Sequence, residues 1–376
     1  MFGRLFTFAI LSYGTVTFAQ PPKPPIDLTP KSPNAQPAKP VVNNEVKQIT
    51  FCFWNVENLF DDKDDKRNNV DEPYDNAFAK DEKLRQLRYD HTADALLKMN
   101  GGHGPDIIAC AEVESIRAAE LLMGTLNKNM KNKADKYTHV LMKNLDAGRH
   151  ISTCVITRLD VSNLATRLHG GNLRILETHL FANGYELCIL ATHWTSKLKQ
   201  VGGGSGDDGR SKYARTIYGV YEKLAANNPA TDFLVCGDFN DTPDAPQVVE
   251  GLHAIGDRKK MVKTSQKPNL LDLFANKDPS KFGTIWYANK PMIYDHICVS
   301  PGMLDEDGWG CDPDSAKTWT EGLIRPGATR REPWRFGDPG RSDMKASDRG
   351  YSDHFPVLVN LKVAAKKVSL PVPAKK

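Results

Sequence analysis

Short apolar segments of strand length recur along the chain from residue 49 onward. Each holds four to six residues and is rich in β-branched or aromatic side chains, as strands buried in sheets are. Nine of them lie at 49–54, 107–110, 153–157, 173–177, 186–191, 232–236, 283–287, 296–299 and 357–361. No later apolar run approaches the ~20 residues that a membrane-spanning helix needs. The pattern therefore predicts packed sheets.

Apolar residues at helical spacing lie between several of these segments. They recur within 82–99 and within 211–226, and each pattern predicts a helix with one face against the core. Asp244 stands where a helix at 245–254 would take its N-terminal cap. Strands that alternate with a few helices predict a large α/β sandwich in one domain.

The two ends of the chain differ in composition from the rest. Residues 1–19 combine one positive charge, an apolar stretch and small residues before Gln20, which is the pattern of a secretory signal peptide. A disordered or buried N-terminal stretch is the alternative. Residues 20–45 are rich in proline and predict a semi-rigid linker, and 363–376 form a tail with lysine and proline. The folded domain is expected at 46–362, in a secreted or periplasmic protein.

The charge balance changes once these ends are set aside. The whole chain carries 50 basic and 46 acidic residues, a net charge of +4. Eight basic and two acidic residues belong to the ends, which leaves 42 basic and 44 acidic residues in the body. The body therefore lacks the basic excess that nucleic-acid binders usually show. Phosphate binding, if present, must depend on the geometry of a site and on a metal.

Six of the seven cysteines lie inside the apolar segments. They are Cys52, Cys110, Cys154, Cys188, Cys236 and Cys298. No Cys-x-x-Cys pair occurs, so a disulfide framework or a zinc knuckle is not indicated. Cysteine in an apolar segment behaves as a small hydrophobic residue, and buried free thiols are expected.

Polar side chains stand at the ends of the apolar segments. They are Asn55 and Glu57 after the first segment, Glu112 after the second, His193, Asp238 and Asn240 after later ones, and Asp295, Asp353 and His354 before the last two. Because strand ends deliver side chains to one rim of a sheet, carboxylates gathered there repel unless a cation lies between them. Oxygen ligands without cysteine suit Mg²⁺, Mn²⁺ or Ca²⁺. With histidines that titrate near neutral pH, the set predicts hydrolysis of phosphate esters.

The order of these motifs resembles the endonuclease/exonuclease/phosphatase superfamily, whose fold is DNase I-like. The resemblance covers about residues 49–361 and rests on Asn55-Val56-Glu57, Glu112, His193-Trp194, Gly237-Asp238-Phe239-Asn240, Asp295-His296 and Ser352-Asp353-His354. It implies a four-layer α/β/β/α sandwich of two mixed β-sheets, with the active site at one rim.

The resemblance also implies a role for each matching residue. Glu112 is expected as the principal metal ligand, with Asn55, Glu57 and Asp353 completing or supporting the metal region. His354 is the expected general base, oriented by Asp295. Asp238 and Asn240 are expected to position the attacking water or the phosphate, and His193 to donate to a phosphate oxygen. Whether His354 or Asp238 takes the proton from water stays open.

The chain departs from the family pattern at three places. Ala111 stands where many relatives have Gln, and Glu57 stands where Asp is frequent. The segment 149–154 lacks features that many relatives place there, and Arg149 or His150 is a candidate to replace the missing phosphate contact.

Three loops are candidates for substrate contact or for solvent exposure. Lys197 and Arg215 flank a glycine-rich segment at 202–206 and are candidates for phosphate binding, as Asn55 is from the rim. An insertion at 305–350 carries tryptophans and arginines that either bind bases and phosphates or form a self-satisfied surface loop. The acidic segment 61–82 is expected to be a solvated loop.

These observations favour a divalent-metal-dependent phosphodiesterase, and in particular an exported nuclease that acts on DNA or RNA. A sphingomyelinase-like enzyme that acts on phospholipids or inositol phosphates is the first alternative. A catalytically inactive binding module on the same fold is the second, and the presence of the full set of polar residues argues against it.

Overall fold

The computed structural model describes residues 45–67, 69–146, 148–197, 206–341 and 343–365. The expected signal peptide, nearly all of the linker, most of the C-terminal tail and residues 202–205 of the glycine-rich segment lie outside these ranges. Within them, no helix combines the length and the apolar character that crossing a bilayer requires.

One sheet has six strands in the order β15-β16-β1-β2-β4-β3. The strands are β1 (Lys47–Leu59), β2 (Ile107–Val113), β3 (His139–Met142), β4 (Ser152–Thr157), β15 (Trp309–Thr318) and β16 (Val357–Val363). Strands β1 and β2 are parallel and every other pair is antiparallel. The sheet is therefore mixed, and β1 and β16, the first and last strands of the described residues, are neighbours in it.

The second sheet has eight strands, seven of which follow the order β10-β11-β14-β9-β8-β7-β5, while β6 pairs with β7. Its strands are β5 (Asp160–Val161), β6 (Arg167–Leu168), β7 (Ile175–Ala182), β8 (Tyr185–His193), β9 (Phe233–Asp238), β10 (Ala254–Ile255), β11 (Leu270–Asp272) and β14 (Asp295–Val299). Strands β8 and β9 are parallel. A separate hairpin joins β12 (Ile285–Tyr287) to β13 (Lys290–Met292).

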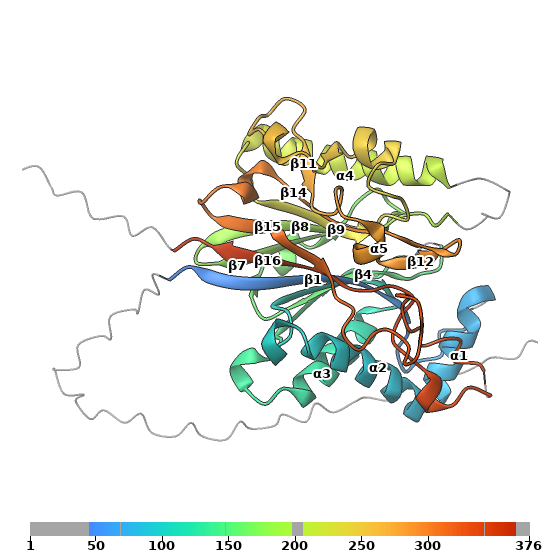
Figure 1. The fold of residues 1–376 in the computed structure, drawn as a ribbon. Coiled ribbons are helices and arrows are strands. Elements are labelled where there is room, and N and C mark those ends of the chain that lie inside the picture. Colours follow the sequence, from blue (N-terminus) through green and yellow to red (C-terminus); the bar gives the residue numbers. More distant parts are fainter. Residues whose placement is uncertain (1–44, 68, 147, 198–205, 342, 366–376) are drawn as a thin grey trace, which may run out of the picture. The chain divides into compact units, whose positions relative to one another are not determined.

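The two sheets pack face to face, and helices cover both outer faces (Figure 1). The helices are α1 (Glu72–Lys80), α2 (Glu82–Leu97), α3 (Ile116–Asn129), α4 (Asp207–Asn227) and α5 (Pro279–Phe282). Phe51 and Phe53 of β1 share the central core with Ile189 of β8. Alternate residues of β1 pack against α2 and α3, and alternate residues of β8 pack against α4. The four-layer α/β/β/α sandwich expected from the sequence is confirmed.

All nine apolar segments contain strand residues, and the helices expected at 82–99 and 211–226 are present as α2 and α4. The seven cysteines are buried and free. The helix expected at 245–254 is wrong: a single π-helical turn spans Gln247–Gly251, and Pro246, not Asp244, precedes it. Pro246 has no backbone N–H, and the chain enters β10 three residues after the turn ends, so no room remains for a longer helix.

The acidic segment 61–82 is not the solvated loop that was expected. Asp61, Asp71 and Asp75 are buried. The carboxylate of Asp75 accepts hydrogen bonds from the backbone N–H groups of Asp65 and Arg67, and α1 begins at Glu72. The acids hold the segment on the protein through partners that a charge pattern does not reveal, which are backbone N–H groups for Asp75 and the guanidinium of Arg149 for Asp71.

The 305–350 insertion also contributes to the core. Its first part forms β15, at the edge of the six-stranded sheet, and Trp309 is fully buried between the sheets. The indole Nε1 of Trp309 donates to the carbonyl of Tyr185, 3.2 Å away. The alternative of a surface loop therefore does not hold for this part of the insertion.

Replacement of Trp309 by Ala is expected to lower the free energy of unfolding by about 3–5 kcal/mol, because it empties a large space between the two sheets. Replacement of the fully exposed Leu164 by Ala is the control and should change it by no more than about 0.5 kcal/mol. Urea denaturation measures both. A loss below about 1 kcal/mol for the Trp309 variant would show that the sheets do not depend on this insertion.

Candidate active site

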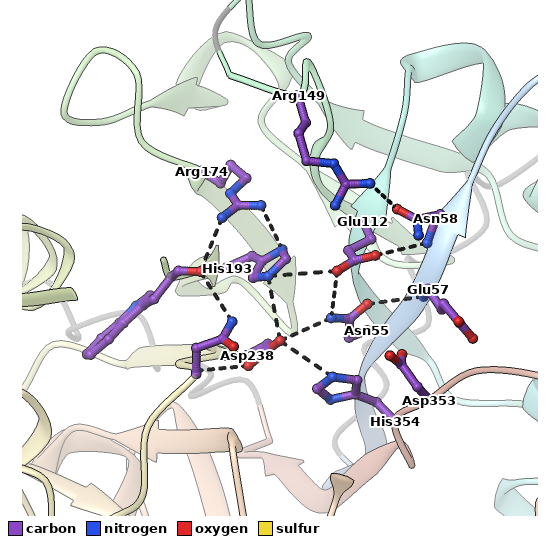
Figure 2. A network of polar contacts seen from close by, with 12 residues as sticks. Asn55, Glu57, Asn58, Glu112, Arg149, Arg174, His193, Asp238, Asp353 and His354 are labelled. Atoms are coloured by element: carbon purple, nitrogen blue, oxygen red, sulfur yellow. Dashed lines mark hydrogen bonds and ion pairs between the residues drawn. The ribbon is translucent and has the colours of Figure 1, made fainter. Parts of the chain in front are cut away.

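Strand ends from both sheets meet at one mouth (Figure 2). In the eight-stranded sheet, Asp238 at the end of β9 is the register partner of His193 on β8 and of Asp295 on β14. In the six-stranded sheet, the end of β1 carries Asn55, and its parallel neighbour β2 carries Glu112. Register within each sheet and packing between them therefore gather side chains that are far apart in the sequence.

The backbone is irregular where these side chains leave the strands. The pairing of β1 with β2 shifts after Asn55, and the pairing of β2 with β4 shifts at Glu112. Glu57 (φ 49°), Asn58 (φ 56°) and Glu112 (φ 61°) have left-handed backbone conformations. Residues other than glycine adopt this region at a cost of about 1–3 kcal/mol each. Adjacent bulges in two neighbouring strands re-aim their side chains at the rim.

The amide of Asn55 joins two carboxylates that belong to different sheets. Its Nδ2 lies 3.3 Å from Oε1 of Glu112 and 3.1 Å from Oδ2 of Asp238. Its Oδ1 accepts the backbone N–H of Glu57 at 3.1 Å, which fixes the orientation of the amide. In this arrangement Asn55 bridges the carboxylates, and its oxygen is directed to the backbone of β1.

His354 and Asp295 form a buried pair. Nδ1 of His354 lies 2.7 Å from Oδ2 of Asp295, and its Nε2 lies 3.7 Å from Oδ2 of Asp238. The carbonyl of His354 accepts the indole N–H of Trp54 at 2.9 Å, which ties the pair to β1. Burial opposes protonation, but the carboxylates of Asp295 and Asp238 outweigh it and hold the pKa of His354 well above its usual range.

Burial raises the pKa of Asp238 to about 7, with Asp295 adding to the effect and His354 opposing it. The backbone N–H of Asn240 donates to Oδ1 of Asp238 at 2.8 Å, and Asn240 itself has a left-handed backbone (φ 51°). The side-chain Nδ2 of Asn240 lies 3.3 Å from the carbonyl of Trp194. Asn240 therefore holds Asp238 at the junction of β8 and β9.

His193 is fixed in one tautomer by Arg174. The guanidinium of Arg174 approaches Nδ1 of His193 at 3.1 Å, and because arginine can only donate, Nδ1 must accept. Burial, and then the charge of Arg174, hold the pKa of His193 well below its usual range, so the ring is neutral. Its proton therefore lies on Nε2, which faces Asp238 at 3.6 Å and Glu112 at 3.9 Å.

Arg335, from the insertion, connects Glu57 to Asp353. Its Nε donates to Oε1 of Glu57 at 2.8 Å, and its Nη2 lies 3.5 Å from Oδ2 of Asp353. Burial, and then the charge of Asp353, raise the pKa of Glu57 to about 7. Oε2 of Glu57 is buried and has no hydrogen-bond partner among the described residues.

These groups open into a cavity of about 820 Å³. Three arginines line it, namely Arg149, Arg174 and Arg335. Aromatic side chains form part of its wall: Tyr74, Trp286, Tyr287 and Tyr294. Of the two candidates for the missing phosphate contact, Arg149 lines the cavity and donates to Asp71 and Asn58, whereas His150 is not part of the lining.

Two of the expected substrate-binding residues lie outside this lining. The ammonium of Lys197 forms an ion pair with Asp241, 2.5 Å away. Arg215 is exposed on α4, which covers the outer face of the eight-stranded sheet. Sequence reasoning missed Arg174, Arg335 and the aromatic wall. Arg174 directly precedes β7, and this position at a strand end is the signal that would have found it.

A family model for the endonuclease/exonuclease/phosphatase family matches residues 50–363. The chain belongs to this family. No curated protein matches it in a sequence comparison. Among solved structures, it is similar to beta toxin of Staphylococcus aureus, with 14% identity, a TM-score of 0.50, and coverage of 83% of this chain and 99% of that chain.

Two further family structures resemble the chain in fold. Sphingomyelinase C of Streptomyces griseocarneus has 15% identity and a TM-score of 0.49, with coverage of 84% of this chain and 99% of that chain. Truncated TDP2 of Caenorhabditis elegans has 14% identity and a TM-score of 0.48, with coverage of 84% and 98%. At these identities the likeness concerns the fold and selects no substrate.

Members of the endonuclease/exonuclease/phosphatase family are phosphoester hydrolases that depend on a divalent metal. The residues of this chain fit such an ion. Carboxylate oxygens of Glu112, Asp238 and Asp353 line the cavity, and the unpartnered Oε2 of Glu57 is buried beside Asp353. A set of oxygen donors suits a hard cation, and two carboxylates joined only by a neutral amide leave negative charge for it to balance.

Replacement of Arg174 by Met is expected to raise the pKa of His193 towards its usual value and to release the Nε2–H tautomer, because the donor to Nδ1 and its positive charge are removed. Long-range ¹⁵N–¹H spectra of the histidine rings, recorded as a function of pH, measure both effects. Replacement of the exposed Arg341, which contacts Asp343, is the control. A His193 signal unchanged in the Arg174 variant would contradict this role for Arg174.

Proposed function

We propose that this protein is a Mg²⁺-dependent phosphodiesterase that cleaves DNA or RNA. The observation that carries the proposal is the meeting of the His354–Asp295 pair, Asp238, the Nε2–H of His193 and the Glu112 carboxylate at one mouth. An acid–base pair, a neutral hydrogen-bond donor and oxygen ligands for a cation are the groups that phosphodiester hydrolysis uses.

The geometry supports a division of work among these residues. Nε2 of His354 and Oδ2 of Asp238 are 3.7 Å apart, beyond a direct hydrogen bond but close enough to hold one water between them. That water attacks phosphorus, and its proton passes to whichever member of the pair is unprotonated. Asp295 keeps the imidazole of His354 oriented throughout.

His193 stabilises the charge that builds up on the phosphoryl oxygens. Its Nε2–H is fixed before the reaction by Arg174, so the donor needs no reorganisation when charge develops. A Mg²⁺ ion held by Glu112, with Glu57 and Asp353 in support, would neutralise charge on the phosphate. Carboxylates are ligands of hard cations, a class that includes Mg²⁺, Mn²⁺ and Ca²⁺.

The cavity wall supports a nucleic acid as the substrate. Trp286 and Tyr287 are partly exposed aromatic side chains in the cavity wall, and bases stack on such side chains without sequence preference. Arg149 and Arg174 lie on the same cavity wall as His193. Because the domain has no net basic excess, it would have to bind a polyanion through arginines in the cavity and through stacking of bases on aromatic side chains. The leader-like residues 1–19 support action outside the cytoplasm.

Assays with single-stranded DNA, plasmid DNA, RNA, sphingomyelin vesicles and inositol phosphates, each with Mg²⁺ and with EDTA, test the proposal. We expect Mg²⁺-dependent cleavage of nucleic acid. His354→Gln should lower kcat by about 10²–10⁴-fold with an unchanged circular dichroism spectrum, because it removes proton transfer. His139→Gln, on β3, is the control and should leave kcat unchanged.

The other outcomes of these assays are equally informative. Hydrolysis of sphingomyelin or inositol phosphates without cleavage of nucleic acid would show that the proposed substrate is wrong. The proposal that the protein is a phosphoesterase would still hold. Binding of any of these substrates without hydrolysis would identify an inactive binding module.

Replacement of Arg335 by Met is expected to tighten Mn²⁺ binding roughly tenfold, because Glu57 and Asp353 lose the positive charge between them and attract a divalent cation more strongly. Electron paramagnetic resonance of free Mn²⁺ measures the affinity. Glu112→Gln should weaken binding, and Arg341→Met should leave it unchanged. Unaltered or weaker binding by the Arg335 variant would mean that its guanidinium does not compete with a metal.

A further inference from the structure

A second group of metal-ligating side chains lies on the outer face of the eight-stranded sheet. Glu177 and His179 are two residues apart on β7, so both point to the same face. Cys188 of β8 is the register partner of His179 and joins them on that face, where it packs with residues of α4. None of the three lines the catalytic cavity.

The ligand atoms of these three residues are already close together. One atom each of Glu177, His179 and Cys188 lie within 4.8 Å of one another. A tetrahedral metal with bonds of about 2.0–2.3 Å holds its ligand atoms about 3.4–3.8 Å apart. The side chains of Glu177 and Cys188 are almost fully buried, so small movements of positioned groups would close the site.

A fourth ligand can come from His169, in the connection between β6 and β7, which contacts Glu177 but lies outside the three-residue group and would move closer to His179 and Cys188 on binding. Nε2 of His169 lies 2.5 Å from Oε2 of Glu177, while Nε2 of His179 lies 2.8 Å from its Oε1. Arg167 also contacts Glu177, but its side chain is 61% exposed and can turn into solvent. The two imidazoles and the guanidinium neutralise Glu177 when no metal is bound.

The second ring nitrogen of His179 has the kind of hydrogen-bond partner that metal-binding histidines have. Nδ1 of His179 is held by Oε1 of Glu186 at 2.7 Å, which directs Nε2 towards Glu177 and Cys188. Metal-binding histidines almost always have such a partner on their other nitrogen, because it fixes the ring and increases its basicity.

We propose that Glu177, His179 and Cys188, with His169 as the fourth ligand, bind Zn²⁺. A thiolate, two imidazoles and one carboxylate form a borderline-soft set that zinc prefers and Mg²⁺ does not. Binding replaces the hydrogen bonds to Glu177 by bonds to the metal. The proton of the Cys188 thiol and the Nε2 proton of His179 leave to solvent, and His169 binds as the neutral imidazole whose proton is on Nδ1.

Such an ion would stabilise the strands that carry part of the catalytic group. It would join the β6–β7 connection to β7 and β8. Arg174 lies between His169 and Glu177 in the sequence, and β8 ends at His193. The ion would therefore restrain both partners of the contact that fixes the His193 tautomer. The zinc site does not depend on the proposed phosphodiesterase activity.

Titration of the metal-free protein with Co²⁺ tests the site, because Co²⁺ bound to a thiolate gives a charge-transfer absorption that oxygen and nitrogen ligands do not give. We expect the band to saturate at one equivalent, to disappear on addition of Zn²⁺ and to persist with excess Mg²⁺. Cys188→Ser should abolish it. Cys298→Ser, at another buried thiol of the same sheet, should retain it.

Variants of the other ligands keep the test decisive if the Cys188 variant does not fold. Zn²⁺ should raise the Tm of the unmodified protein and of Glu112→Gln, but not of His179→Gln. Glu186→Gln should lower the Zn²⁺ affinity about 10–100-fold, as loss of a histidine partner does. Absence of the Co²⁺ band, its persistence in Cys188→Ser, or an equal shift in Tm for His179→Gln would overturn the proposal.

Discussion

The hydrogen bonds from the Asn55 amide to Glu112 and Asp238 are the constraint on which the site depends. They place carboxylates of two different sheets against one another in a region with little access to water. Buried carboxylates are costly unless positive or hydrogen-bonding groups compensate them. The surrounding arrangement supplies that compensation: Arg174 sets the donor of His193, Asp295 pairs with His354, and Arg335 lies against Glu57. The same buried carboxylates that could support catalysis are therefore the groups whose burial costs free energy.

The meeting of the candidate site residues at one rim was predictable because their positions follow strand geometry. A polar residue directly before or after a buried strand emerges at a sheet edge, and the order of six motifs that contain such residues indicated the fold. Arg174 and Arg335 were not predictable in the same way. Arg335 is one of six arginines in the second half of the insertion, and only the folded chain brings it to Glu57. The aromatic wall depends on the β12–β13 hairpin, whose place over the cavity no local pattern specifies.

The errors have a common physical cause, which is that local composition does not show distant partners. Asp75 belongs to an acidic segment, yet it is buried because backbone N–H groups of the same segment satisfy it. The proposed zinc site is also invisible in cysteine spacing, because antiparallel pairing of β7 with β8 is what brings Cys188 opposite His179. In both cases the relevant neighbours are set by pairing and packing, and not by separation along the chain.

The pairing of β1 with β16 determines when during synthesis the candidate site can form. Lys47 is the register partner of Val363, and the indole of Trp54 donates to His354, 300 residues further along the chain. Strand β1 therefore lacks its neighbour on one side until β16, residues Val357–Val363, has left the ribosome. Contacts of such long range form late in folding. A site assembled in this order is incomplete until His354 has been synthesised.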